Sequence, residues 1–502
     1  MEKMLRKLAI VVVGVILFSS CSKNLFKMNS TSNVVSTIEG DFLTPLATPP
    51  ATNGQGSLTA QVTTSTIYDG KKSRVLGYQS GSILGPSIIV NSGDKININF
   101  QNNLSENSNI HWHGLIIPAN MDGHPEDVAQ PGSSRNYNFT ISQRAGMYWY
   151  HPHPDGFTAE QAYLGLAGAF IVRDAEEQKL NLPSGDLEIP LVIQDKRINT
   201  DYSLDYSPNM SDIMSGYMGS SILVNGVYSP YKDVKTRNYR FRVLNGSNGR
   251  IYNLALSNGA SFTVIGSDGG LLSAPQTVSS LLLGPGERAD LIVNFSNYNV
   301  GTELFLESRT FSAGATQGIQ SFRIMKFKVA LNEKDSFTLP TALSSINPIS
   351  NGNSIMTRTF DISNEGMGSM GSMGGMGGMG SMGSTGTMMK GMHRINDKVY
   401  DKSRIDVTVQ SGSTEIWVFD NTLGSEPHPM HIHGLQFQVL DRSGGRNKLI
   451  STEGGWKDTV LLLPGEKVRV IMSFGQNKGK YVLHCHNLEH EDDGMMLQFE
   501  II

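Results

Sequence analysis

Cysteine and excess positive charge are both scarce in this sequence. Its 502 residues contain two cysteines, Cys21 and Cys485, and 41 basic against 45 acidic side chains. The chain has no basic run or basic excess, which excludes an extended nucleic-acid-binding surface. Beyond residue 20 no stretch has the pattern of a long helix. The 54 glycines and many short β-branched runs instead indicate an all-β protein.

The N-terminal residues have the pattern of an export signal. Three basic side chains precede an apolar run at 8–18, and two serines and Cys21 follow it. The run is short for a membrane span, so we expect a signal peptide over 1–20. The end of the run resembles a bacterial lipobox, which predicts lipid on Cys21 as the only membrane anchor. The alternatives are a plain secretory signal or an uncleaved anchor.

Two further expectations follow from this N-terminus. Residues 21–57 are rich in Ser, Thr, Asn and Pro and are expected to form a flexible tether. The protein is expected in the cell envelope, facing the periplasm. If Cys21 carries lipid, Cys485 is the only cysteine left, and no intramolecular disulfide can form.

A segment with a Pro-Gly pair recurs three times along the chain. In each copy the pair precedes an alternating apolar strand pattern, and another strand pattern lies upstream. The second spacing between pairs is longer than the first, by about the length of a Met/Gly/Ser-rich stretch at 366–392. The three segments are 128–140, 283–295 and 462–474, and the upstream strands are 90–103, 236–247 and 409–421.

Short strands separated by turns favour β-sandwiches over other all-β architectures. Three repeats therefore predict three β-sandwich domains, which we place at 58–180, 181–340 and 341–502. The stretch 366–392 is expected to be an insert in the third domain.

Ten of the twelve histidines fall into four short motifs near the two ends of this repeat region. The interval from 153 to 428 contains only one histidine, His393. The motifs are His111-Trp112-His113, His151-Pro152-His153, His428-Pro429-Met430-His431-Ile432-His433, and His484-Cys485-His486 followed by His490.

The motif around Cys485 predicts two different metal sites on one strand. Successive side chains of a strand point to opposite faces, so Cys485 faces away from His484 and His486. On the cysteine side, a thiolate, two imidazoles and a weak axial thioether complete the ligand set of a blue-copper electron-transfer site. These ligands are Cys485, His428, His490 and Met495.

The other eight histidines form four i, i+2 pairs, each of which places two imidazoles on one face of a strand. Such a set suits a cluster of three coppers. Two pairs belong to the first predicted domain and two to the third, so the cluster is expected where these domains meet. A single pair is usually structural or solvated, but four pairs with a cysteine in the last are very improbable by chance.

These motifs resemble those of the multicopper oxidase family, over about residues 58–502. The resemblance implies cupredoxin-like Greek-key domains, four copper ions per chain, and reduction of O2 to water with electrons from a reducing substrate. It also implies which residues bind each copper. The type 1 ligands are His428, Cys485, His490 and Met495; the type 2 ligands are His111 and His431; the type 3 ligands are His113, His151 and His486 for one copper and His153, His433 and His484 for the other.

Reduction of O2 to water also consumes protons, which acids near the cluster can supply. Asp122 and Glu491 match positions where bacterial members of the family carry such acids. The alternative for each is a solvated loop carboxylate. His124 is expected to be a loop histidine.

The stretch 366–392 holds nine methionines and eleven glycines, a composition that cannot form a packed core. Thioethers are soft ligands that prefer Cu(I), and the stretch resembles the methionine-rich insert of bacterial copper-efflux oxidases. A flexible linker is the alternative. The candidate Cu(I) ligands are Met367, Met370, Met373, Met376, Met379, Met382, Met388, Met389 and Met392.

Three functions remain open. The first is a cuprous oxidase that turns Cu(I) into Cu(II) and serves copper tolerance. The second is a laccase-like phenol oxidase, and the third is a non-enzymatic copper-binding lipoprotein of the envelope. The complete ligand set argues against the third, and the methionine-rich stretch favours the first over the second.

Overall fold

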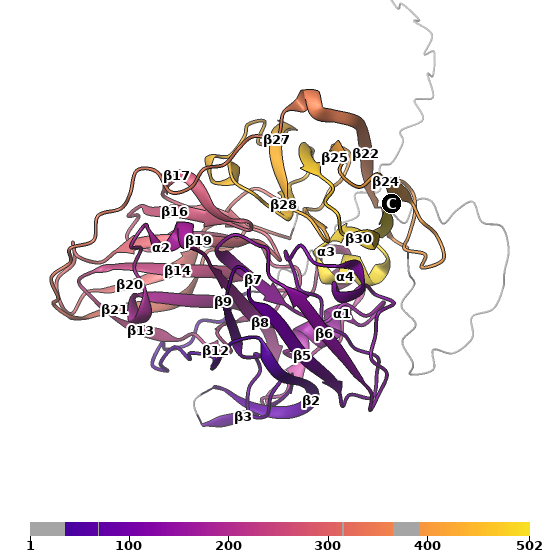
Figure 1. The fold of residues 1–502 in the computed structure, drawn as a ribbon. Helices are drawn as coiled ribbons and strands as arrows, with labels where there is room; N and C mark the ends of the chain where they lie inside the picture. The colour runs from indigo at the N-terminus through magenta and orange to yellow at the C-terminus, as the bar shows by residue number, and fades with distance from the viewer. Residues whose placement is uncertain (1–35, 69, 314–315, 365–390) are drawn as a thin grey trace, which may run out of the picture. The chain divides into compact units, whose positions relative to one another are not determined.

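The computed structural model describes residues 36–68, 70–313, 316–364 and 391–502. In these residues strands dominate (Figure 1), which confirms the all-β prediction. The four α-helices have at most seven residues each. None of the described helices is long and apolar enough to cross a membrane. The predicted signal peptide and Cys21 lie outside the described residues. The nine candidate methionines do as well, apart from Met392.

The strands form three pairs of sheets, and the first pair comprises β1 to β8. One sheet has the order β1-β4-β8-β7 and the other β3-β2-β5-β6. The chain crosses between the sheets repeatedly, so parallel neighbours such as β2 and β5 arise, as in Greek-key sandwiches. The elements are β1 (Ala51–Thr52), β2 (Gln55–Tyr68), β3 (Lys71–Gly77), β4 (Ser87–Asn91), β5 (Lys95–Asn102), η1 (Ala119–Met121), β6 (Ser134–Thr140), β7 (Gly146–Tyr150), α1 (Thr158–Leu164), β8 (Gly168–Arg173) and α2 (Ala175–Gln178).

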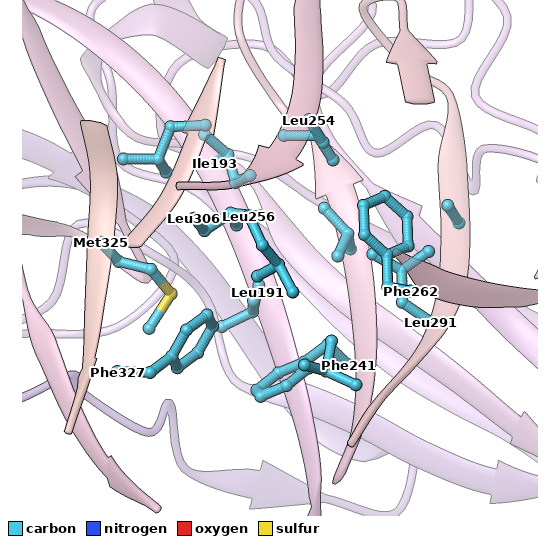
Figure 2. Packing of buried hydrophobic residues seen from close by; sticks show 14 of the residues in the cluster. Leu191, Ile193, Phe241, Leu254, Leu256, Phe262, Leu291, Leu306, Met325 and Phe327 are labelled. Atoms are coloured by element: carbon cyan, nitrogen blue, oxygen red, sulfur yellow. The ribbon is translucent and has the colours of Figure 1, made fainter. Parts of the chain in front are cut away.

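The second sandwich, β9 to β21, has an eight-stranded and a five-stranded sheet. Figure 2 shows its core, where Leu191 and Phe241 of one sheet pack toward Leu306 and Phe327 of the other. The elements are η2 (Gly185–Leu187), β9 (Glu188–Ile198), β10 (Leu204–Asp205), α3 (Met210–Ser215), β11 (Ser221–Val224), β12 (Val227–Tyr228), β13 (Tyr231–Lys235), β14 (Asn238–Asn245), β15 (Tyr252–Leu256), β16 (Phe262–Ser267), β17 (Gly270–Val278), β18 (Leu281–Leu283), β19 (Arg288–Asn294), β20 (Glu303–Ser308) and β21 (Phe322–Leu331).

The third sandwich, β22 to β31, has sheets of order β23-β22-β25-β29-β27 and β24-β31-β30-β26-β28. The methionine-rich stretch joins β22 to β23, which pair antiparallel at its two ends. The elements are η3 (Asn351–Asn353), β22 (Ser354–Asn364), β23 (His393–Ile395), β24 (Val407–Val409), β25 (Thr414–Asn421), β26 (His428–Ile432), β27 (Phe437–Gly444), η5 (Ser451–Glu453), β28 (Thr459–Leu462), β29 (Glu466–Ser473), β30 (Gly479–Cys485), α4 (Leu488–Asp493) and β31 (Met496–Ile501).

The Pro-Gly repeat marks the same place in all three sandwiches. The strand after each Pro-Gly pair lies antiparallel to the predicted upstream strand, as β5/β6, β14/β19 and β25/β29. Each turn glycine has a left-handed backbone, which glycine adopts without steric cost. Its N–H donates to the carbonyl of a buried asparagine at the end of the upstream strand. The glycines are Gly132, Gly286 and Gly465 (φ 75°, 81° and 79°), and the asparagines are Asn102, Asn245 and Asn421.

Residues 36–57 correct one prediction. They were expected to belong to a flexible tether, but Phe42 is buried with its ring against Phe305, and Ile38 pairs with Ser221. Strand β2 already begins at Gln55. The polar composition of this region hid the buried Phe42 ring. Backbone hydrogen bonds from Ile38 to Ser220 and from Leu46 to Tyr231 also hold the segment along the second sandwich.

Candidate metal centre

The four histidine pairs are placed by two strand pairings. In the first sandwich, His111 and His151 exchange backbone hydrogen bonds of 2.8 and 3.2 Å. In the third, β26 and β30 pair so that His431 lies opposite His484 and Met430 opposite Cys485. This register puts the histidines on one face of β30 and Cys485 on the other.

Imidazoles from the first and third sandwiches interleave. The His113 ring stacks on His431 at 3.8 Å between centroids, and His111 stacks on His433 at 3.7 Å. The ring centroid of His486 lies 4.9 Å from that of His113 and 5.3 Å from that of His151. All eight side chains are at most 1% exposed. The structure therefore brings all eight predicted cluster histidines together between these two sandwiches.

The hydrogen bonds of these rings fix which nitrogen faces the cluster. The Nδ1–H groups of His111 and His431 donate to the backbone carbonyls of Asp122 and Asp458, at 2.7 and 2.8 Å. Their Nε2 atoms are then unprotonated and face each other at 3.4 Å. The same arrangement brings the Nε2 of His484 within 3.1 Å of His433 Nε2 and 3.3 Å of His153 Nε2. Opposed lone pairs at such distances suit a metal cation between them.

His113 is oriented the opposite way. Its Nε2 lies 3.1 Å from an oxygen of Asp458 and 3.2 Å from the Thr459 hydroxyl. Its buried Nδ1 has no hydrogen-bond partner among the described residues. His113 therefore presents Nδ1 to the cluster, whereas His111 and His431 present Nε2.

Cys485 forms a second, smaller group with two histidines. Its Sγ lies 3.5 Å from His428 Nδ1 and 3.6 Å from His490 Nδ1, and these two nitrogens are 3.3 Å apart. The backbone N–H of Asn487 donates to Sγ at 3.4 Å. Met495 is fully buried in the same core cluster, and its carbonyl accepts a hydrogen bond from the Cys485 N–H.

These donors fit metal ions. Burial lowers the pKa of His431 and His433 well below the usual value and lowers that of His428 to about 3, so the rings stay neutral and can coordinate. Burial also raises the pKa of the Cys485 thiol. A metal cation beside it supplies the positive charge that a buried thiolate needs.

The two candidate acids lie against cluster histidines. Asp122 Oδ2 accepts a 2.7 Å hydrogen bond from His433 Nδ1 and is 3.6 Å from His111 Nδ1. The Glu491 oxygens lie 3.4 Å from His153 Nδ1 and 3.2 Å from His484 Nδ1. Both side chains are at most 2% exposed, so neither is a solvated loop acid.

Comparisons with known proteins agree with this geometry. Three family models described as multicopper oxidase match residues 59–177, 204–319 and 379–502. The chain is 34% identical to a multicopper oxidase of Staphylococcus haemolyticus over 450 residues, which cover 89% of this chain and 88% of that protein. It is 33% identical to a laccase of Bacillus subtilis, over 85% and 90% of the two chains.

A solved structure of similar form is a multicopper oxidase of Campylobacter jejuni, described as a metallo-oxidase. It has 29% sequence identity and a TM-score of 0.79, and the match covers 93% of this chain and 96% of that one. The chain belongs to the multicopper oxidase family. It is thus a copper-dependent oxidoreductase that uses O2, with three cupredoxin-like domains.

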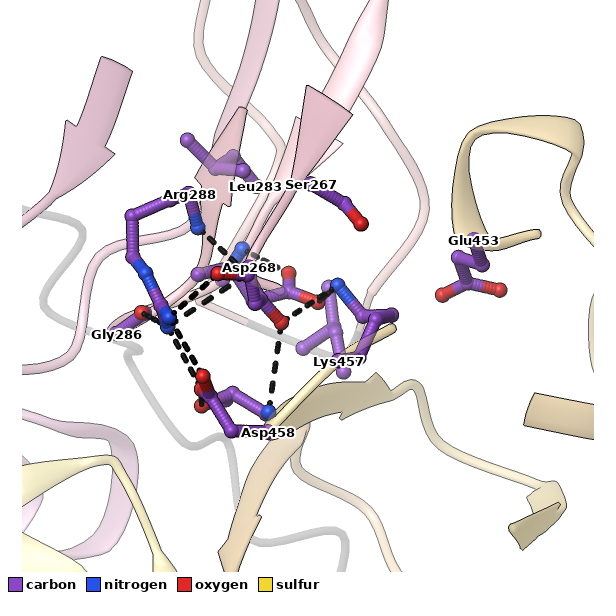
Figure 3. A network of polar contacts seen from close by, with 12 residues as sticks. Ser267, Asp268, Leu283, Gly286, Arg288, Glu453, Lys457 and Asp458 are labelled. Atoms are coloured by element: carbon purple, nitrogen blue, oxygen red, sulfur yellow. Dashed lines mark hydrogen bonds and ion pairs between the residues drawn. The ribbon is translucent and has the colours of Figure 1, made fainter. Parts of the chain in front are cut away.

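The second sandwich also contributes to this multicopper oxidase centre, and no sequence pattern indicated this contribution. Arg288, at the start of β19, donates to the Met147 carbonyl of the first sandwich at 3.0 Å. It also donates to both oxygens of Asp458 in the third, at 2.7 and 2.5 Å. Figure 3 shows this network, in which Lys457 pairs with Asp268 at 2.8 Å. Because Asp458 also contacts His113, the histidine-free sandwich supports the cluster.

Two histidines outside the motifs have different surroundings. His124 is 5% exposed, and its Nδ1 accepts a hydrogen bond from the Glu126 backbone, as expected for a loop histidine but more deeply buried. His393 is fully buried and stacks on His490, with 3.8 Å between centroids and 16° between planes. Its position next to Met392 and apart from the motifs was the only sequence signal.

Proposed function

We propose that this multicopper oxidase binds four coppers and oxidises Cu(I) to Cu(II) with O2 as acceptor, in copper tolerance. Balance requires four Cu(I), one O2 and four protons to give four Cu(II) and two waters. The bound coppers would accept electrons one at a time and deliver four to O2. The Cys485 group is assigned to type 1 copper, His111 with His431 to type 2, and the remaining six histidines to the type 3 pair.

Protons for water formation are assigned to Asp122 and Glu491. Each carboxylate contacts two cluster histidines through the nitrogen that faces away from the cluster. Each therefore reaches the cluster edge without occupying a ligand position, as suits a general acid.

The single observation that carries the choice of Cu(I) is the connection of the methionine-rich stretch. It continues through Met392 into β23, and His393 at the start of β23 stacks on the type 1 candidate His490. A soft-ligand segment thus ends one residue from a side chain that touches the electron-accepting site. Thioethers suit Cu(I) and give no advantage with phenols.

A laccase-like phenol oxidase is the second candidate, favoured by the similarity to the laccase of Bacillus subtilis. A phenol needs an apolar approach to the Cys485 group and has no use for thioethers.

We also propose export to the cell envelope, with lipid on Cys21 as the anchor, on the sequence pattern alone. Mass spectrometry of the mature N-terminus of the membrane-associated protein would test this, because an unmodified mature N-terminus would reject it.

The test of Cu(I) oxidation is a deletion of residues 366–390, which keeps Gly391 and leaves a three-residue connection between β22 and β23. Such a connection is a common hairpin length. The matched control replaces the eight methionines of this segment with serine at constant length. We expect both variants to keep their blue colour and thermal stability and to consume O2 more slowly at limiting Cu(I). Oxidation of a small phenol should not fall. If Cu(I) kinetics are unchanged in both variants, the stretch is a linker and the laccase alternative gains.

A further inference from the structure

The end of the methionine-rich stretch is fastened to helix α4 by one carboxylate. Asp493 accepts hydrogen bonds from the backbone N–H of Gly391 at 3.1 Å and of His393 at 2.8 Å. Its Oδ2 also lies 3.1 Å from His393 Nδ1. The Gly391 N–H additionally lies 2.9 Å from the Asp493 carbonyl. This set of contacts fixes both the backbone and the ring of His393 relative to α4.

The fixed ring covers one face of His490, which lies on the same helix. The planes are 16° apart and the centroids 3.8 Å apart, which is close to a parallel stack. The edge of His490 is held separately, because its Nε2 lies 3.1 Å from the Met214 carbonyl and 3.1 Å from the Asn487 side chain. His490 is therefore constrained in its plane by hydrogen bonds and across its face by His393.

We infer that His393 is a positioning residue of the Cys485 site: its stacked ring holds His490 in place and keeps water from its face, with Asp493 as its anchor. This inference rests on the proposed assignment of copper to Cys485, His428 and His490. Groups that orient a metal-binding histidine contribute to metal affinity, and exclusion of water around such a site raises its reduction potential. Because Gly391 shares the Asp493 anchor, the methionine-rich stretch and His490 are mechanically connected.

The experiment compares His393→Ala with His393→Phe in the full-length, copper-loaded protein. Alanine removes the stack and admits water. Phenylalanine keeps an aromatic face at His490 and loses only the ring contact with Asp493, because the backbone N–H of residue 393 can still donate to that carboxylate. We expect His393→Ala to shift the blue absorption band, to lower the reduction potential of the Cys485 site, and to weaken copper retention against a chelator by roughly 10-fold. His393→Phe should stay close to the wild-type protein in all three.

A matched control is His124→Ala, which also removes a buried imidazole, in a loop where its ring bonds to the Glu126 backbone. It should leave the blue band and the reduction potential of the Cys485 site unchanged. If both changed in this variant as well, the effect of His393→Ala would reflect a general loss of stability. If His393→Ala is blue with unaltered band, potential and copper retention, the positioning role is overturned. The same holds if His393→Phe changes as much as His393→Ala. A wild-type protein without a blue band would instead overturn the copper assignment in the proposed function.

Discussion

The Cys485 site and the eight-histidine cluster share strand β30 but depend on different amounts of the chain. The side chains of the Cys485 site come from residues 428–495 of the third sandwich. The cluster needs two histidine pairs from the first sandwich and two from the third, with Arg288 of the second beside them. The ligand side chains of one site thus lie within a domain, with only the Met214 carbonyl reaching His490 from the second sandwich, whereas the ligands of the other come together only when domains dock. Single substitutions should therefore affect one of the two sites more than the other.

The largest difference between the two sites is expected from Cys485→Ser. Serine offers no thiolate, so the blue band and all oxidase turnover should be lost. The cluster ligands lie on the other face of β30 and should still bind about three coppers. Absorption spectroscopy and copper analysis of the purified variant measure both effects. A blue Cys485→Ser protein would show that the type 1 assignment is wrong.

Glu491→Gln should slow the reaction with O2 at the cluster without slowing reduction of the Cys485 site. The amide keeps the shape of the side chain but removes its acidity, and loss of a general acid typically costs about 10²–10⁴-fold in rate. Stopped-flow spectroscopy should show normal bleaching of the blue band by a reductant and slow reoxidation by O2. Asp122→Asn, on the other acid, should act in the same direction. Equal slowing of both half-reactions would count against a role in proton supply.

Arg288→Met should make the cluster less stable than the Cys485 site. The variant leaves Asp458 buried without its guanidinium partner, while Asp268 keeps Lys457. Breaking a buried ion pair in this way costs about 3–5 kcal/mol. Copper should be lost first from the cluster, because Asp458 also holds His113. Residual blue colour after partial thermal unfolding, measured beside total copper, tests this order. Arg74→Met, at an exposed position of the first sandwich, is a suitable control. Loss of blue colour before cluster copper would contradict the expected order.

The sequence predicted these sites unevenly, for physical reasons. Strand alternation and the spacing of histidines were sufficient to separate Cys485 from the cluster, because both follow from local backbone geometry. The Pro-Gly turns identified three equivalent strand pairs, since a left-handed glycine is required at each. In contrast, the contacts of Arg288 and of His393 join residues distant in sequence, and no local pattern specifies which charged or aromatic side chains will meet. The anchored segment at 36–57 was missed because its buried apolar side chain, Phe42, lies in a polar stretch.

The smallest effects are expected at the three equivalent turn glycines, where one substitution can be compared in three places. An alanine at each must adopt a left-handed backbone, which costs about 1–2 kcal/mol for a residue with a Cβ. At Gly132 and Gly465 a Cβ would meet no atom within 4 Å, so the strain is the whole effect. At Gly286 the Cβ would lie 2.9 Å from ring atoms of His486. Gly286→Ala should therefore destabilise the protein more than the other two and alone should alter the copper content or spectrum of the cluster.

Thermal unfolding and copper analysis of the three glycine variants measure these two effects. Three equal losses of stability with unchanged copper would mean that the second sandwich does not press on the cluster at this turn.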